Sequence, residues 1–525
     1  MSAAGPAVAA EWRPRFNPWL IAIPVMLATF MVILDTSIVV VALPYIAGNL
    51  GATQDESTWV LTSYLVANAV ILPASAWLSS FFGRKNFLIV CTIVFTVASA
   101  TCGLAVSMPM LVIARVLQGI GGGAMQPLSQ AILLESFPPT QRGTATALFG
   151  LGVVVAPIIG PTLGGWLTDQ LSWRWTFYIN LPVGIAAAIL MLIMIEDPPY
   201  IRASRPRRID AAGFAYMALF LATLQVVLDK GQDADWFAAV WLRWFAGICA
   251  ASLIAFIVRE LRIAQPIVDL RVFANRNFAV SALLFGFFGL SIYALITLQP
   301  LFLQSLLGYP AFDAGLSVTP RGVGALAALL LVGALEGKVN PKILVALGFG
   351  STAFASLLLS RLTLQISMSS VVVANVFSGL GTSFIFVPLT TLAIGTLRNE
   401  QIGNATGIQN LVRNVGGSIG LSYVSTMLQR YAQVHQALLV GHLSPVNPQY
   451  RAKLSALQGL FERGFTAPDA LLKAREMLYR VLLQQSQYWA FVDLFFIVAI
   501  LSAACIVVVP IFRRPVTVHK VSLAE

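Results

Sequence analysis

The chain has 525 residues, of which 58% are hydrophobic and only 10% are charged. A soluble protein carries about 25% charged residues, so the composition excludes a soluble enzyme, a nucleic-acid-binding protein and a disordered scaffold. The formal net charge of +11 would suggest a polyanionic partner in a soluble protein. Here the apolar residues form blocks of about 20 or more, long enough to cross a bilayer as helices. The chain is therefore predicted to span a membrane many times.

The apolar blocks divide into fourteen predicted transmembrane helices. Helices are expected because lipid leaves every backbone polar group to be satisfied within a helix or a closed barrel. The predicted spans are residues 19–43, 58–80, 86–106, 109–133, 144–168, 176–195, 211–228, 239–258, 278–302, 314–335, 342–362, 369–396, 402–427 and 489–510. The predicted fold class is an all-α polytopic membrane protein.

The short connections predict the orientation of the chain. An even number of spans puts both termini on one side of the membrane. The connections on that side contain nineteen Lys and Arg residues, and those on the other side contain three. The positive-inside rule therefore places both termini in the cytoplasm. Most of the positive charge is explained by sidedness, and no nucleic-acid partner is expected.

The connections also predict the domain organisation. Two basic stretches, 196–210 and 259–277, flank two helices and separate six helices before them from six after them. Two bundles with a linking pair are a common layout in transporters. The predicted parts are a cytoplasmic tail (1–18), an N-terminal six-helix bundle (19–196), basic loops with two linking helices (197–277), a C-terminal six-helix bundle (278–510) and a second tail (511–525).

One hydrophilic insertion, residues 428–488, is predicted on the external face between the last two spans. Residues 441–449 are typical of a turn, and 450–463 and 468–487 have the pattern of amphipathic helices. These two helices could pack as a hairpin and offer their remaining apolar surface to a helical partner. The alternative is an insertion without a function, since added loop length costs little free energy.

Two charged residues inside spans are the strongest candidates for chemistry, because buried charge in a membrane is costly and usually functional. Asp35 lies about 12 Å from the external end of its helix, and Arg115 lies about 9 Å from the external end of its own. These similar depths permit a direct or water-bridged pair. A protonatable carboxylate beside a fixed cation has tunable proton affinity and could couple protons to cargo. A purely structural salt bridge is the alternative.

The helix over 144–168 carries small residues at every fourth position: Gly152, Ala156, Gly160 and Gly164. Such a stripe permits close approach of another helix. Pro157 and Pro161 are predicted points of bending. Close packing alone would explain the stripe, and a gating role remains the alternative.

Polar residues at four further positions could line a cavity for cargo. Tyr64 and Asn68 lie in the second span, and Asn410 and Arg413 lie in the thirteenth. The latter two are near the cytoplasmic end, so a structural arginine that snorkels to the interface is the alternative for Arg413. The histidines lie outside the spans and the four cysteines are dispersed within apolar blocks, so neither a catalytic base in the membrane nor a metal site is expected.

At these residues the sequence resembles the major facilitator superfamily, and within it the fourteen-helix drug:proton antiporters of the EmrB/QacA type. The segments that carry the likeness are LDTSIVVVALP at 34–44, RVLQG at 115–119, GPTLGG at 160–165 and WRWTFYINLP at 173–182. RVLQG is similar to the family's motif B and GPTLGG to its motif C, which is associated with export. The likeness is strong over the first six helices and looser afterwards.

The loop between the second and third spans departs from the family's motif A. Its positions are occupied by Ala76, Ser80, Phe81, Gly83, Arg84 and Lys85. The glycine turn and the final cations are present, but the acidic residue that forms the family's gating salt bridge is missing. The resemblance therefore leaves open whether this loop gates transport.

The resemblance implies a proton-coupled exporter of hydrophobic or amphipathic drugs in the inner membrane, and hence a drug-resistance protein. No cofactor is expected, because a proton gradient supplies the energy. The external insertion favours the Gram-negative branch, in which the transporter works with a periplasmic adaptor and an outer-membrane channel. Asp35 and Arg115 are the expected proton-coupling residues. The expected gating or packing residues are Gly83, Arg84, Lys85, Gln118, Gly119, Gly152, Pro157, Gly160, Pro161, Gly164 and Gly165.

Three alternatives remain. The chain could export an endogenous metabolite, or it could be an ion-coupled importer of the same superfamily. A membrane-embedded enzyme is disfavoured, because only one aspartate lies deep in a span and no histidine does, so paired-aspartate and histidine chemistries lack their residues. Gly337-Lys338 is followed by Val339, so no phosphate-binding loop is present for ATP.

Overall fold

The computed structural model describes residues 14–138, 141–197, 210–232, 234–263, 266–309, 311–335, 338–365, 368–397 and 399–512. Most of the two predicted tails (1–13 and 513–525) and of the basic connection after the sixth span (198–209) lies outside these residues. The described residues form helices joined by short connections, with no strand among them. The predicted all-α fold is confirmed.

The helices of the first half are α1 (Pro18–Leu50), α2 (Gln54–Phe82), α3 (Arg84–Gly103), α4 (Met108–Ser136), α5 (Arg142–Gln170), α6 (Trp175–Tyr178) and α7 (Asn180–Met194). The middle contains α9 (Ala211–Lys230), η2 (Trp236–Ala238), α10 (Val240–Arg262) and η3 (Leu270–Ala274). The second half contains α11 (Arg276–Ser305), α12 (Ala311–Val318), α13 (Pro320–Leu335), α14 (Pro341–Ser360), α15 (Met368–Ile394), α16 (Asn399–Val440), η4 (Gly441–Leu443), α17 (Pro448–Phe461), α18 (Ala467–Val508) and η5 (Val509–Ile511).

Each predicted span coincides with one or two of these helices. Not all of these helices are long and apolar enough to cross a membrane on their own. Among the described residues, twelve helices are long and apolar enough to cross a membrane, and a bent pair formed by Arg142–Pro157 and Thr162–Gln170 would make thirteen. The predicted span 402–427 lies within α16, where Asn, Gln and Arg side chains interrupt the apolar sequence. The count of fourteen and the cytoplasmic placement of both termini stay predictions.

Local sequence signals fix the first helix boundaries. Asn17 caps α1 by accepting a hydrogen bond from the amide of Trp19 over 3.0 Å, and Pro18 occupies the first helical position, where no amide donor is needed. Thr53 and Glu56 form a reciprocal capping box at the start of α2. The end of α1 and the start of α2 are thereby set close together.

The helices pack in two groups with a linking pair between them. In the first half α1 packs on α4, α5 and α7, and α2 packs on α4. In the second half α11 packs on α16, while α15 packs on α13 and α14. Helices α9 and α10 pack on each other, and α9 contacts both α2 and α16. The domain boundaries predicted from the sequence stay a proposal, which this packing supports.

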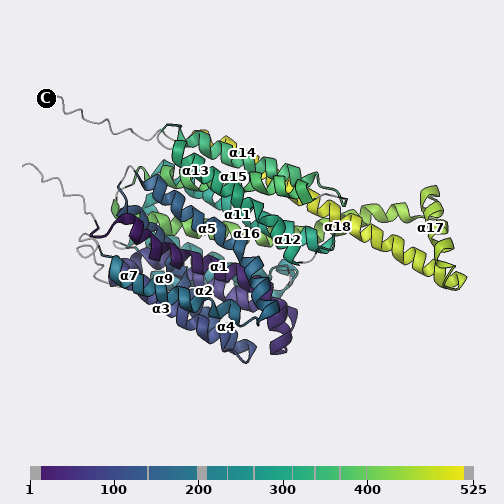
Figure 1. The fold of residues 1–525 in the computed structure, drawn as a ribbon, viewed down its shortest axis with the longest axis horizontal. Helices are drawn as coiled ribbons and strands as arrows, with labels where there is room; N and C mark the ends of the chain where they lie inside the picture. Colours follow the sequence, from purple (N-terminus) through teal and green to yellow (C-terminus); the bar gives the residue numbers. More distant parts are fainter. Residues whose placement is uncertain are drawn as a thin grey trace, which may run out of the picture.

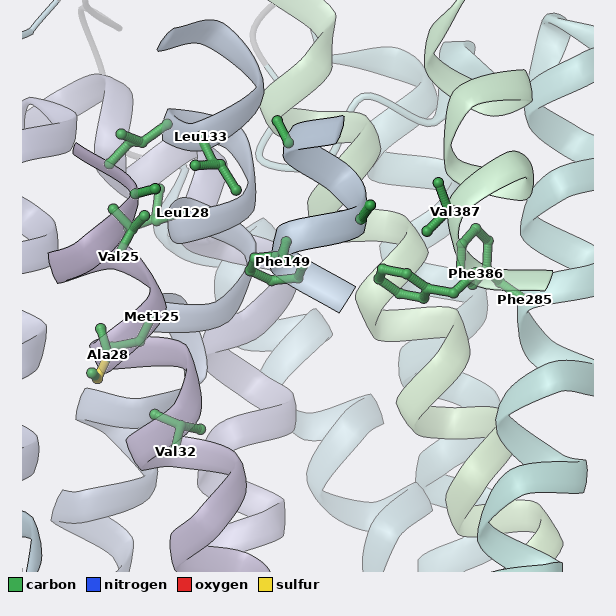
Figure 2. Close-up of a cluster of buried hydrophobic side chains, with 14 of the residues drawn as sticks. Val25, Ala28, Val32, Met125, Leu128, Leu133, Phe149, Phe285, Phe386 and Val387 are labelled. Carbon is green, nitrogen blue, oxygen red and sulfur yellow. The ribbon is translucent and has the colours of Figure 1, made fainter. Parts of the chain in front are cut away.

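One buried apolar cluster joins both groups of helices at the end of the molecule that is predicted to face the cytoplasm. It includes Leu128 of α4 and Phe149 of α5 from the first group, and Phe285 of α11 and Phe386 of α15 from the second. The rings of Phe149 and Phe386 stack with centroids 6.4 Å apart, and Phe285 meets Phe386 edge-on at 5.9 Å. Figure 2 shows Phe149 opposite Phe386 between the two groups. The bundles are closed together at this end.

The apolar clusters at the opposite end belong to single bundles. One consists of first-half residues such as Val39, Val60 and Phe177. The other consists of second-half residues such as Phe302 and Phe491. Within the described chain, the clusters that join the two bundles are thus concentrated at the predicted cytoplasmic end.

The predicted insertion 428–488 is not separated from its neighbouring helices, because both helices continue into it. Helix α16 runs without interruption to Val440, and α18 begins at Ala467 and continues into the last span. The predicted turn near 441–449 is present, and the two predicted amphipathic helices correspond to α17 and the first part of α18. Together these segments project from the bundle (right side of Figure 1). Polar residues on a helix surface in water resemble a loop in hydropathy, so composition alone did not reveal the continuity.

Candidate functional site

Asp35 and Arg115 form a direct ion pair in the interior of the first bundle. Arg115 Nη1 lies 2.6 Å from Asp35 Oδ2, and both side chains are 0% exposed. Asp35 comes from the middle of α1 and Arg115 from the first half of α4, which runs in the opposite direction. The similar depths predicted from the sequence thus correspond to direct contact.

Two further side chains donate to the Asp35 carboxylate. Gln118 Nε2 and Asn180 Nδ2 lie 2.8 and 2.9 Å from Oδ1. Gln118 lies on α4 and Asn180 begins α7. The carboxylate therefore accepts three hydrogen bonds from two helices besides its own. Asn180 is held in turn by Ser99 Oγ of α3 at 3.0 Å.

The Arg115 guanidinium makes further contacts, although its Nη2 atom is buried without a hydrogen-bond partner. Its Nε donates to the carbonyl of Val60 on α2 over 2.9 Å, and its Nη1 contacts Gln118 Oε1 over 2.8 Å. The Tyr64 ring lies beneath the guanidinium carbon at 4.2 Å, which adds a cation–π contact. The ion pair thus connects α1, α2, α4 and α7 in one network.

A second group of charges lies at the predicted cytoplasmic end of the same bundle. Arg84 forms an ion pair with Glu135 at the end of α4. The amide of Lys85 donates to Asp197 Oδ1 over 2.8 Å, and Lys85 Nζ donates to the carbonyl of Leu192 over 2.7 Å. Two carboxylates from elsewhere in the chain, Glu135 and Asp197, thus bind this loop through the Arg84 side chain and the Lys85 amide.

Gly83 is the turn residue that this arrangement requires. Its φ is +88°, a conformation that L residues rarely adopt. A Cβ atom there would lie 2.6 Å from Asp197 Oδ2. Gly83 is thus needed both for the turn and for the close approach of Asp197.

The small-residue stripe of α5 packs against α1, as expected for a close helix contact. A Cβ atom on Gly160 would lie 1.9 Å from Ser37 Oγ, and one on Gly164 would lie 2.9 Å from the carbonyl of Ile38. Gly152 faces the end of the Met26 side chain, whereas Gly165 has only an ordinary contact with Val41. The helix bends by 42° between Pro157 and Thr162, the segment that contains Pro161.

The comparisons with known proteins agree with this architecture. The sequence profile of the Major Facilitator Superfamily matches residues 25–421. The chain belongs to the major facilitator superfamily. It is 36% identical over 443 residues to the multidrug export protein EmrB of Escherichia coli strain K12, covering 84% of this chain and 86% of that protein.

A second superfamily relative is the fatty acid resistance protein FarB of Neisseria gonorrhoeae, 36% identical over 420 residues, with 80% of this chain and 82% of that protein covered. Among solved structures, the human organic anion transporter MFSD10 is similar with a TM-score of 0.58 at 12% identity, covering 93% of this chain and 100% of that one. That likeness concerns the fold alone.

Membership of the superfamily identifies the chain as a transporter and not an enzyme, and as a multi-pass protein of the inner membrane. Transporters of this superfamily generally need no cofactor. Within the described ranges, no group of three or more His, Cys, Asp or Glu residues could hold a metal ion.

The four predicted cavity residues of this superfamily member lie on α2 and α16. Tyr64 is buried beneath Arg115, whereas Asn68, one turn further along α2, is half-buried. Asn410 donates to Gln130 Oε1 of α4 over 2.9 Å and so connects the two bundles. Arg413 is 6% exposed and lies fourteen residues into α16, about 21 Å along the helix. It therefore does not snorkel to the cytoplasmic interface.

Several residues of the network were not singled out from the sequence. Asn180 and Ser99 complete the shell around Asp35, and Glu135 and Asp197 bind the altered loop. Asn180 had a signal, since it is a polar residue within the similar segment 173–182. Glu135 and Asp197 follow apolar helices at their cytoplasmic ends, where a charged residue is also expected without any special role.

Proposed function

We propose that the protein is a proton-coupled exporter of hydrophobic or amphipathic drugs. The observation that carries the proposal is the fully buried carboxylate of Asp35, paired with Arg115 and accepting three hydrogen bonds. The names of the relatives, a multidrug export protein and a fatty acid resistance protein, support an apolar or amphipathic cargo and export as the direction.

Protonation of Asp35 would change the contacts between helices. A neutral carboxyl group loses its charge attraction to Arg115, and the guanidinium remains charged because an arginine side chain does not lose its proton in proteins. Arg115 would then keep only its neutral partners, the carbonyl of Val60 and the amide of Gln118. The link from α1 to α4 and α7 weakens, while the link from α4 to α2 persists. A proton thereby favours a different packing of these helices.

The closed cytoplasmic end supports an alternating-access cycle. The aromatic contact between Phe149 and Phe386 and the bond between Asn410 and Gln130 join the bundles at that end. Opening toward the cytoplasm requires both contacts to separate. The charges around Arg84 lie at the same end, and a Cβ on Gly403 of α16 would lie 3.4 Å from Arg84 Nη2. We propose that this group contributes to the cytoplasmic gate.

The test compares two aspartates of the first bundle. In proteoliposomes with an imposed pH gradient, Asp35→Asn should abolish gradient-driven drug transport, because the side chain can no longer exchange a proton. Asp169→Asn is the matched control: Asp169 is exposed at the end of α5 and accepts a hydrogen bond from Tyr45 over 2.6 Å. It should transport as the wild type does. Gradient-driven transport by Asp35→Asn would exclude the coupling role. Net accumulation of drug in the opposite direction would indicate an importer.

The projecting segment formed by α17 and the outer parts of α16 and α18 is proposed to dock a periplasmic adaptor that leads to an outer-membrane channel. Its apolar side chains are incompletely buried: Leu472 is 68% exposed and Leu460 is 58% exposed. No residue of α17 is buried. A helical partner would cover such surface.

The docking role has a separate test. Gln436 Nε2 of α16 donates to Tyr479 Oη of α18 over 3.0 Å, so a short Gly/Ser linker from 436 to 479 removes the tip and keeps both helices in register. This variant should transport normally in proteoliposomes but should not confer resistance on a cell with an outer membrane. Normal resistance would instead identify the segment as a tolerated insertion. Loss of transport in proteoliposomes would show a role within the transporter itself.

A further inference from the structure

The second bundle contains a buried arginine that has no countercharge. Arg321 is in the first turn of α13 and is 3% exposed. Its Nη2 lies 3.3 Å from Gln299 Oε1 of α11, while its Nε and Nη1 have no hydrogen-bond partner. The ion pairs found among the described residues do not include it.

The unpartnered groups on Arg321 and Gln299 are donors. Besides Nε and Nη1 of the arginine, the Nε2 atom of Gln299 is buried without a partner. Gln299 Oε1 already accepts from the arginine, so the amide presents its donor side. Three unsatisfied N–H-bearing atoms on two adjacent side chains, one of them cationic, match the needs of an anion with several acceptor oxygens.

The position of Arg321 is fixed by close packing. A Cβ on Gly379 of α15 would lie 1.9 Å from the carbonyl oxygen of Arg321, and one on Gly324 would lie 2.0 Å from the carbonyl of Val376. Helices α13 and α15 therefore touch through their backbones on both sides of this turn. The backbone of Arg321 therefore cannot move away from α15 without separating the two helices.

A buried guanidinium cannot lose its proton, and burying it without a counterion is unfavourable. In the first bundle Arg115 has Asp35. In the second bundle Asp493 Oδ2 lies 2.8 Å from His435 Nε2. Asp313 lies in the first turn of α12 and forms no ion pair with Arg321. Arg413 of α16 adds a second buried positive charge, whose Nη2 contacts only the amide of Asn414. The described interior of this bundle therefore favours negative charge.

We propose that Arg321 and Gln299 bind the anionic group of the cargo, so that the transporter selects amphipathic anions carrying a carboxylate or sulfonate. The proposal rests on the proposed export function and narrows its cargo. It places cargo recognition in the second bundle and proton binding in the first. The cargo anion would satisfy the three free donors and supply the missing negative charge.

The test uses two probes that differ only in the sign of a permanent charge. Decanesulfonate and decyltrimethylammonium have the same alkyl chain, and neither redistributes as a weak acid or base in a pH gradient. Binding of each to the purified full-length protein is measured by equilibrium dialysis. The wild type should bind decanesulfonate at least about tenfold more tightly than the cation. Arg321→Gln should weaken anion binding by about 10- to 100-fold and leave cation binding unchanged, and Arg321→Lys should keep part of the anion preference.

Control variants separate recognition from folding. Arg361, exposed at the end of α14, gives the matched control Arg361→Gln, which should bind both probes as the wild type does. If Arg321→Gln does not fold, Gln299→Leu removes one donor without touching the charge and should weaken anion binding alone. Equal affinity of the wild type for the two probes, or equal weakening of both by these variants, overturns the proposal.

An inorganic anion is the other source of the same chemistry. Chloride and phosphate are therefore titrated against bound decanesulfonate. Weak competition that needs concentrations far above that of the probe supports an organic cargo. Tight, Arg321-dependent binding of chloride or phosphate that decanesulfonate does not displace overturns the proposal. Loss of the proton-coupled export function would show only in the pH-gradient assay, so the two failures are distinguishable.

Discussion

The two bundles treat buried charge in opposite ways. In the first, Asp35 and Arg115 neutralise each other, and the donors of Gln118 and Asn180 complete the shell of the carboxylate. In the second, Arg321 has a single amide contact and two free N–H-bearing atoms. A neutralised ion pair can respond to a proton, whereas a buried cation without a countercharge attracts an anionic ligand. Similar helical frameworks thus suit two different tasks.

Removal of the cation from the first bundle should have the largest effect. Arg115→Met leaves Asp35 buried without its countercharge, which should lower the free energy of unfolding by about 3–5 kcal/mol. Thermal unfolding in detergent measures the loss. The double variant Asp35→Asn/Arg115→Met removes both charges and should recover much of it. An equally unstable double variant would show that shape, and not charge balance, holds the site together.

Removal of the buried cation from the second bundle should have the opposite effect on stability. Arg321→Met replaces an unpaired buried cation by an apolar side chain of similar length, so the free energy of unfolding should rise by about 1–3 kcal/mol. The same unfolding assay applies, in the absence of added anions. A loss of stability comparable to that of Arg115→Met would mean that Arg321 has an internal counterion, and the contrast between the bundles would disappear.

The first bundle permits a comparison of two glycines with positive φ, Gly83 at its predicted cytoplasmic edge and Gly51 at the opposite end, after α1. Gly83→Ala should cost about 1–3 kcal/mol, since the new methyl group meets both an unfavourable backbone conformation and Asp197. Gly51 has a φ of +64° but open space around it, so Gly51→Ala should lower the free energy of unfolding by only about 1 kcal/mol. Equal losses in a thermal unfolding assay would remove the close approach of Asp197 as a constraint.

The smallest expected effect concerns the linking pair outside both bundles. Asp210 caps α9 and accepts hydrogen bonds from Arg259 Nη2 at 2.6 Å and from the amide of Gly213 at 3.0 Å. Burial raises the pKa of Asp210, but the bonds from Arg259 and Gly213 outweigh it and hold the pKa below its ordinary value of 3.8. Asp210→Ala should cost about 1 kcal/mol at neutral pH.

The pH dependence of the Asp210 contribution follows from the lowered pKa. Because the folded state favours the ionised carboxylate, the stabilisation is complete above the ordinary value and disappears as the pH falls through the lower folded-state value. The melting temperatures of wild type and Asp210→Ala should therefore differ at neutral pH and converge in strong acid. A constant difference over the whole range would assign the effect to packing alone.

The sequence predicts those structural features that follow from the residues of a single helix. Long apolar blocks predict the helices, the four-residue spacing of Gly160 and Gly164 predicts a close contact, and depth counted from helix ends places Asp35 beside Arg115. The partners of the altered loop were missed, because Glu135 and Asp197 reach Arg84 and Lys85 only after the helices have packed. The free donors of Arg321 were missed for the same reason, since an arginine in a span has no visible lack of partner until its neighbours are known.

Helix α18 joins the external tip to the membrane without a break. Its 42 residues correspond to a rod about 63 Å long, and its inner half packs on α14 and α16. A rod of this length turns a tilt of about 10° at the bundle into a displacement of about 10 Å at the far end. A rearrangement of the second bundle that tilts α18 would therefore displace the tip and any partner bound to it. A bound partner would in turn restrain that rearrangement.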